Sequence, residues 1–241
     1  VDISQSTVTI NDTRIVRVGF GSEVGGTGVQ AQTNSTLTIE GSHIEGGGSF
    51  GVHAVGGSMY LKDTEIIATN RSTGAQQFEA DGSGIWAEAF SEAVTLDNVT
   101  VDGGSFVGAW MEAPTVNVNG GSFANFAYGV YLPGDQASAS GRRLTVTGAS
   151  FTDLAQIAIL GVASSTVTGS TFQVVTGVPD PNNSRPYGAV RIVAPGGIVD
   201  VSANVISGTG GSDSIRVLGS ASDGPVASVN ITGNTVQNVV A

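Results

Sequence analysis

The 241-residue chain contains no cysteine, and charged residues make up only 12% of it. Without thiols, neither a disulfide framework nor a thiolate metal site can form. The chain has 9 Lys and Arg residues against 20 Asp and Glu residues, and its net charge of −11 argues against nucleic acid or an anionic membrane as a partner. No apolar run approaches the ~18 residues of a membrane-spanning helix, so we expect no direct membrane insertion.

Glycine, by contrast, is abundant at 36 residues, and much of it belongs to an internal repeat. A hydrophobic residue is followed five positions later by a second one, and this pattern occurs nine times. The nine copies are Ile10 to Ile15, Ile39 to Ile44, Leu61 to Ile66, Leu96 to Val101, Val118 to Phe123, Val146 to Phe151, Val167 to Phe172, Val201 to Ile206 and Ile231 to Val236. Such self-similarity is typical of a solenoid, in which one short unit stacks on its own copies.

The second position after each leading hydrophobe predicts a sharp corner. Its residues are Asp12, Gly41, Asp63, Asn98, Gly120, Gly148, Gly169, Ala203 and Gly233. Gly, Asn and Asp enter the left-handed backbone region at low cost, so only Ala203 departs from the pattern. Before the corner, apolar and polar residues alternate, as in Val8-Thr9-Ile10, which indicates a strand with one buried face.

A further strand precedes this pair in most repeats, and it usually begins at a small residue, as in Gly51-Val52-His53-Ala54 and Gly84-Ile85-Trp86-Ala87. Three short strands and three corners in about 21 to 35 residues make one coil of a parallel β-helix. We therefore predict an all-β fold with one domain over residues 1–241 and about nine coils. Loop insertions are expected where the repeat is interrupted, at 67–83, 133–143, 173–188 and 219–227.

On these strands and corners the chain resembles the right-handed, pectate-lyase-like parallel β-helices. That group includes polysaccharide lyases and hydrolases, phage tailspikes and the passenger domains of bacterial autotransporters. The resemblance covers nearly the whole chain and implies a right-handed β-solenoid with three short strands per coil. Because its motif is architectural, it implies no catalytic residue.

Equivalent residues of stacked coils should lie directly above one another, because the coils are ~4.8 Å apart. Phe123, Phe151 and Phe172 close the repeat in three successive coils, so they should stack inside as an aromatic column. The same reasoning gives an outward row for each sheet. For the first strand this row is Asp2, Gln30, His53, Trp86, Trp110, Tyr131, Ala158, Arg191 and Arg216. For the second strand it is Thr9, Thr38, Tyr60, Thr95, Asn117, Thr145, Thr166, Asp200 and Asn230.

The first-strand row is the main functional indication, because both tryptophans of the chain fall on it in consecutive coils. We predict that it forms an apolar platform for sugar rings, with a histidine at one end and two arginines at the other. The predicted ligand-binding residues are His53, Trp86, Trp110, Tyr131, Arg191 and Arg216. A loop at 67–83 would bring Phe78, Glu79 and Asp81 beside this platform.

Glu88 and Glu112 lie two residues beyond the tryptophans on the same face. Stacked coils would place their carboxylates roughly 5 Å apart, the separation of a retaining glycosidase pair, so they are the catalytic candidates. The alternative is that the aromatic row only stabilises the solenoid through ring contacts, and that the carboxylates are solvated or form a weak cation site. Because His43 and His53 fall in different strands, we expect no metal site, and we expect no cofactor.

We therefore expect an extracellular structural or adhesive rod, similar to an autotransporter passenger, with a polysaccharide or host-surface glycan as partner. A polysaccharide-active lyase or glycoside hydrolase is the first alternative. Neither end of the sequence shows a capping helix, so a second alternative is end-to-end self-association into filaments, or continuation of a longer rod.

Overall fold

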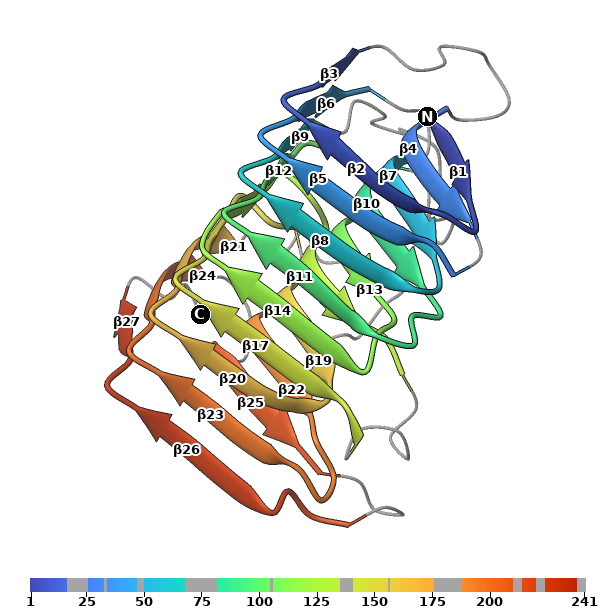
Figure 1. The fold of residues 1–241 in the computed structure, drawn as a ribbon. Helices are drawn as coiled ribbons and strands as arrows, with labels where there is room; N and C mark the ends of the chain where they lie inside the picture. The colour runs from blue at the N-terminus through green and yellow to red at the C-terminus, as the bar shows by residue number, and fades with distance from the viewer. Residues whose placement is uncertain are drawn as a thin grey trace, which may run out of the picture.

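A computed structural model of the chain describes residues 1–16, 26–32, 34–46, 50–67, 82–104, 106–134, 141–155, 157–175, 188–209, 214–219 and 224–237. These residues form 27 strands in three parallel sheets of nine strands each. The chain visits the three sheets in turn, so every coil adds one strand to each sheet, and the coils stack from the N-terminal to the C-terminal end (Figure 1). The fold is a right-handed parallel β-helix of nine coils, as predicted.

The strands have the following bounds. The first sheet contains β1 (Asp2–Ser4), β4 (Thr27–Gln32), β7 (Phe50–Val55), β10 (Ser83–Glu88), β13 (Val107–Met111), β16 (Tyr128–Leu132), β19 (Ile157–Val162), β22 (Gly188–Val193) and β25 (Ile215–Leu218). The second sheet contains β2 (Thr7–Asn11), β5 (Thr36–Glu40), β8 (Ser58–Lys62), β11 (Ala93–Asp97), β14 (Thr115–Asn119), β17 (Arg143–Thr147), β20 (Ser164–Thr168), β23 (Ile198–Ser202) and β26 (Ser228–Thr232). The third sheet contains β3 (Arg14–Val16), β6 (His43–Glu45), β9 (Glu65–Ile67), β12 (Thr100–Asp102), β15 (Ser122–Ala124), β18 (Ser150–Thr152), β21 (Thr171–Val175), β24 (Val205–Thr209) and β27 (Thr235–Gln237).

All nine predicted corners between the second and third sheets have a left-handed backbone. Their φ values lie between 45° at Asp63 and 67° at Gly120. Ala203 follows the same geometry, with a φ of 55°, although its side chain makes this conformation unfavourable. The corner is therefore imposed by the stacking of the coils and does not depend on a permissive residue at every level.

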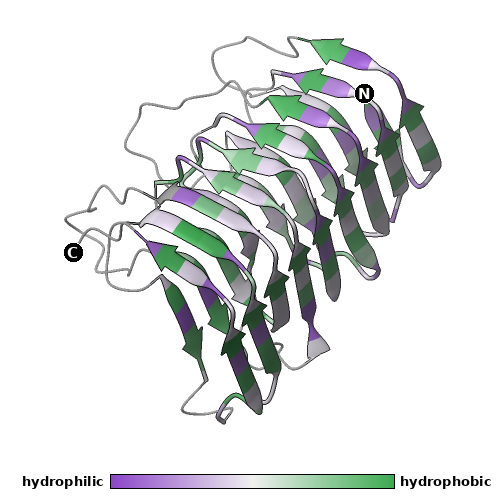
Figure 2. Ribbon diagram, turned by 90° about the vertical axis from the view of Figure 1, so that its left-hand side faces the viewer, coloured by the Kyte–Doolittle hydropathy of each residue, from purple (hydrophilic) through white to green (hydrophobic). Residues whose placement is uncertain are grey.

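The interior consists of residue columns in the register that the repeat predicts. Phe123 and Phe151 stack with ring centroids 5.3 Å apart and planes 13° apart, and Phe151 and Phe172 with centroids 5.0 Å and planes 4° apart. All three side chains are fully buried. Figure 2 shows hydrophobic and hydrophilic residues alternating along the stacked strands, so one side of each sheet faces this hydrophobic core.

A column of small residues lines the first sheet where it meets the third. At Gly129, an added Cβ would lie 2.6 Å from the carbonyl oxygen of Ala158 and 2.7 Å from the Phe151 ring. Glycine is required there because the backbone passes so close to the aromatic column. The prediction that Ala158 faces outward is wrong: it is fully buried and continues this column of small residues.

The strands that flank each predicted loop insertion have their boundaries close to the expected positions. For example, β9 ends at Ile67 and β10 begins at Ser83. Residues 68–81, 135–140, 176–187 and 220–223 of these insertions lie outside the described residues, so the insertions stay predictions. Among the described residues, no helix has the length and apolarity to cross a membrane. In the ninth coil, the inward residues Val229, Ile231 and Val236 are 47%, 48% and 47% exposed.

Candidate functional site

The predicted outward row exists on the first sheet, with one correction. Strand register aligns Asp2, Gln30, His53, Trp86, Trp110, Tyr131, Leu160, Arg191 and Arg216. We call this set the first-sheet outer row. The structure places Leu160, not Ala158, in the seventh coil of the row. The sequence Ile157-Ala158-Ile159-Leu160 is apolar throughout, so it offered no alternation from which to tell the two faces apart.

The aromatic rings of this row pack on one another. Trp86 and Trp110 are stacked, with ring centroids 4.3 Å apart and planes 17° apart. Tyr131 meets Trp110 edge-on at 4.6 Å, and Phe50 lies 5.5 Å from Trp86 on the other side. Trp86 is only 9% exposed, whereas Trp110 and Tyr131 are half-buried. The row is therefore less open than an outward position implied, because ring-on-ring contact covers the faces of Trp86.

A second group of apolar residues flanks the row and forms a small hydrophobic cluster that is separate from the core. Val107, Tyr128 and Ile157 are buried in it, and they pack with Trp110, Tyr131 and Leu160, which lie on the outer face. The sequence interpretation overlooked this cluster. Its members stand three positions before the row residues Trp110, Tyr131 and Leu160, and this recurring apolar spacing could have revealed it.

The two candidate carboxylates have different surroundings. Glu112 accepts hydrogen bonds on both oxygens: the Trp110 indole Nε1–H donates to Oε1 at 3.2 Å, and the Ala89 amide donates to Oε2 at 3.4 Å. Glu88 Oε2 lies 3.5 Å from His53 Nε2, and its side chain is 41% exposed. Glu112 therefore orients the indole of Trp110, while Glu88 presents its carboxylate to solvent beside an imidazole.

Arg191 and Arg216 are register partners at the C-terminal end of the row, next to Leu160. Both arginines are half-buried and interact with other residues of the chain. The row thus runs from polar side chains (Asp2, Gln30 and His53) through the aromatic rings to Leu160 and the two guanidinium groups. Phe78, Glu79 and Asp81, which were predicted to lie beside the platform, fall outside the described residues.

Within the described ranges, no group of three or more His, Asp or Glu side chains is arranged to hold a metal ion. His43 lies on the third sheet and His53 on the first, and each faces a glutamate of the next coil.

These observations define the class of the protein: a right-handed parallel β-helix with an aromatic ladder on the outer face of its first sheet. A comparison of the chain with protein-family models, curated proteins and solved structures found no match. The class therefore rests on strand topology and register, and a fold of this kind supports many unrelated functions.

Proposed function

We propose that the chain is an extracellular rod with a structural or adhesive role, similar to an autotransporter passenger, which binds glycans on its first-sheet face. The observation that carries the proposal is the unbroken stacking of nine coils around a hydrophobic core. Nine coils at ~4.8 Å give a stiff spacer of roughly 40 Å. The extracellular setting rests on the resemblance to surface-exposed β-helices alone.

The glycan contact is supported by the half-buried edge of the first-sheet outer row. Trp110 and Tyr131 keep part of their rings accessible, and the carboxylate of Glu88 lies at the border of the aromatic cluster. Aromatic edges next to hydrogen-bonding carboxylates are the chemistry that sugar recognition uses: apolar C–H faces pack on rings and hydroxyl groups donate to oxygens.

The test is a glycan array probed with the parent protein and with Trp110→Ala and Glu88→Gln variants. Each substitution should remove most of the binding while the circular-dichroism spectrum stays β-rich. Thr145→Ala, on the outward row of the second sheet, is the matched control and should bind like the parent. If the Trp110→Ala protein binds every glycan that the parent binds, the row stabilises the solenoid and does not contact a ligand.

A polysaccharide-active enzyme is the alternative on the same face, with Glu88 and Glu112 as its carboxylates. Reducing-sugar and lyase assays on a polysaccharide panel separate the two functions. In an enzyme, the Glu88→Gln, Glu112→Gln double variant should lose turnover. In an adhesin, no turnover exists in the parent, and Glu112→Gln should weaken binding less than Trp110→Ala. The bonds from Trp110 and Ala89 to Glu112 favour an orienting role over a free nucleophile.

Self-association is a further alternative, favoured by the exposure of Val229, Ile231 and Val236 in the ninth coil. The equivalent residues one coil earlier, Val199, Val201 and Ile206, are fully buried. A further coil, from the same chain or from another copy, would bury this apolar surface. Sedimentation velocity at rising protein concentration tests whether another copy supplies this coil, since stacked copies would show a rising mean sedimentation coefficient. Electron microscopy would then show fibres.

A further inference from the structure

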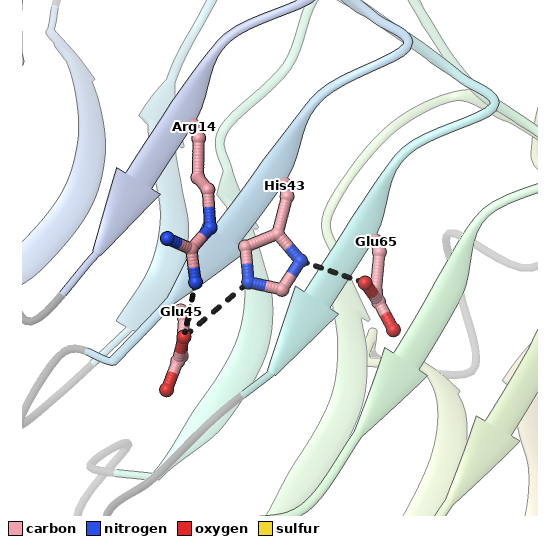
Figure 3. A network of polar contacts seen from close by, with 4 residues as sticks. All are labelled: Arg14, His43, Glu45 and Glu65. Carbon is pink, nitrogen blue, oxygen red and sulfur yellow. Dashed lines mark hydrogen bonds and ion pairs between the residues drawn. The ribbon is translucent and has the colours of Figure 1, made fainter.

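A polar network lies on the outer face of the third sheet, apart from the first-sheet outer row. It consists of Arg14 on β3, His43 and Glu45 on β6, and Glu65 on β9 (Figure 3). Strand register places Arg14, His43 and Glu65 in one row across three successive coils. Glu45 stands two residues beyond His43 on the same face. We call these four residues the His43 network.

Both nitrogens of the His43 ring face carboxylate oxygens. Nδ1 lies 2.7 Å from Oε2 of Glu65, and Nε2 lies 3.4 Å from Oε2 of Glu45. The Arg14 guanidinium reaches the same Glu45 oxygen at 3.6 Å. The imidazole is one-quarter exposed, while the Glu65 side chain is half exposed, so the network borders solvent and exchanges protons freely with it.

The number of N–H donors on the His43 ring decides whether both carboxylate contacts are hydrogen bonds. An ionised carboxylate only accepts hydrogen bonds, and a neutral imidazole has a single N–H to donate. Both contacts can therefore be hydrogen bonds only when His43 carries two protons. With one proton, one ring nitrogen turns a lone pair toward a carboxylate, and the contact on that side is repulsive.

We propose that the His43 network is a proton-dependent link between the second and third coils. In the imidazolium form it joins Glu45 of β6 to Glu65 of β9. Loss of the proton breaks one of the two hydrogen bonds and removes the positive charge that attracts Glu65 across the two coils. Three charged groups face the network's ring: Arg14 from β3, Glu45 from β6 and Glu65 from β9. The link is complete when His43 carries both protons and weaker when it carries one, and histidine is the side chain that changes charge between about pH 5 and 8.

The strands that carry this link are short. β3, β6 and β9 each have three residues, so few backbone hydrogen bonds hold them together. Ile44 and Ile66, beneath the network, are fully buried and do not titrate. The link should therefore change the local opening of β6 and β9 and leave the global fold intact.

Hydrogen exchange of the β6 and β9 amides at pH 5.5 and 8.5, corrected for intrinsic rates, tests the proposal. The parent should be better protected than the His43→Gln variant at pH 5.5, by about 1.5- to 5-fold for a partly exposed ion pair. At pH 8.5 the two proteins should differ less. A ratio of parent to variant protection that is the same at both pH values overturns the proposal.

Two further variants keep the result specific. Glu65→Gln keeps the shape of the side chain but removes its charge. The ratio of parent to Glu65→Gln protection should therefore depend on pH in the same way as the ratio of parent to His43→Gln protection. His53→Gln changes the other histidine, on the first sheet, and should leave the pH dependence at β6 and β9 unchanged. If His53→Gln abolishes that dependence, it does not arise from His43.

Discussion

The molecule has two aromatic ladders with the same coil spacing, one inside and one outside. The inner ladder of Phe123, Phe151 and Phe172 is fully buried, and its planes lie within 13° of parallel. The outer ladder is irregular: Trp86 stacks on Trp110 at 17°, but Tyr131 meets Trp110 at 79°. The difference shows that coil stacking alone aligns rings only where the surrounding core fixes their side-chain conformation.

The outer ladder also differs from the inner one in its polar contacts. The indole of Trp110 donates to Glu112, whereas the phenylalanine rings have no polar atom to satisfy. Tyr and Trp side chains suit a border position because one end is apolar and the other forms hydrogen bonds. The inner ladder should therefore contribute mainly to stability, whereas the outer ladder leaves part of Trp110 and Tyr131 exposed.

Removing the middle inner ring should have the largest effect. Phe151→Ala deletes a buried ring that contacts rings on both sides, and such changes typically cost ~3–5 kcal/mol of unfolding free energy. The outward Thr145→Ala change should cost little. Denaturant midpoints of the two variants give the comparison, and equal, mild values would mean that the two side chains face the same environment.

Within the outer ladder, Trp86→Ala should destabilise more than Trp110→Ala, because Trp86 is almost completely covered. We expect Trp86→Ala to approach ~3 kcal/mol and Trp110→Ala to fall below it. Urea denaturation of both variants measures the order. If the order is reversed, the ring contacts of Trp86 contribute less than the Glu112 bond of Trp110.

The corners should show smaller effects. Gly148→Val has no neighbouring atom within 4 Å of its Cβ, so its cost should be the left-handed strain of φ 65° alone, ~1–2 kcal/mol. Ala203→Gly relieves the same strain but adds backbone entropy to the unfolded chain, so it should be neutral or slightly stabilising. Thermal melting compares both with the parent, and a destabilised Ala203→Gly protein would show that its methyl group packs favourably.

Tyr60 is an aromatic residue whose register neighbours are Thr38 and Thr95, so it has no ladder partner in its row. Desolvation by burial and the charge of Asp97 raise the pKa of its phenol above 10. A group with a raised pKa in the folded state binds its proton more tightly there, so stability should fall as the pH rises past about 10. In Tyr60→Phe this loss should be absent when melting temperatures are followed between pH 9 and pH 11.

The register of most positions could be predicted from the sequence. The repeat of two hydrophobes five residues apart placed every residue of the second-sheet row and of the inner column, because each corner restarts the alternation. The prediction was wrong at Ala158, where an all-apolar strand provides no alternation. The repeat also left open how far Trp86 is buried, since burial depends on Phe50 and Trp110 from neighbouring coils.

The candidate site likewise has a part that the sequence predicted, its residues, and a part that it did not, their contacts. Its residues were found because a strand period of two fixes which side chains share a face, and this property is local. Their partners were not found, because the distances that join Glu112 to Ala89, or His43 to Glu65, span one coil and depend on side-chain conformation. The sequence by itself thus determined the coil, its corners and the composition of each row, except in the seventh coil of the first sheet, where Leu160 stands in place of Ala158. Only the tertiary structure decided which rings cover one another and which carboxylates hold a donor, because these are contacts between coils that no single repeat contains.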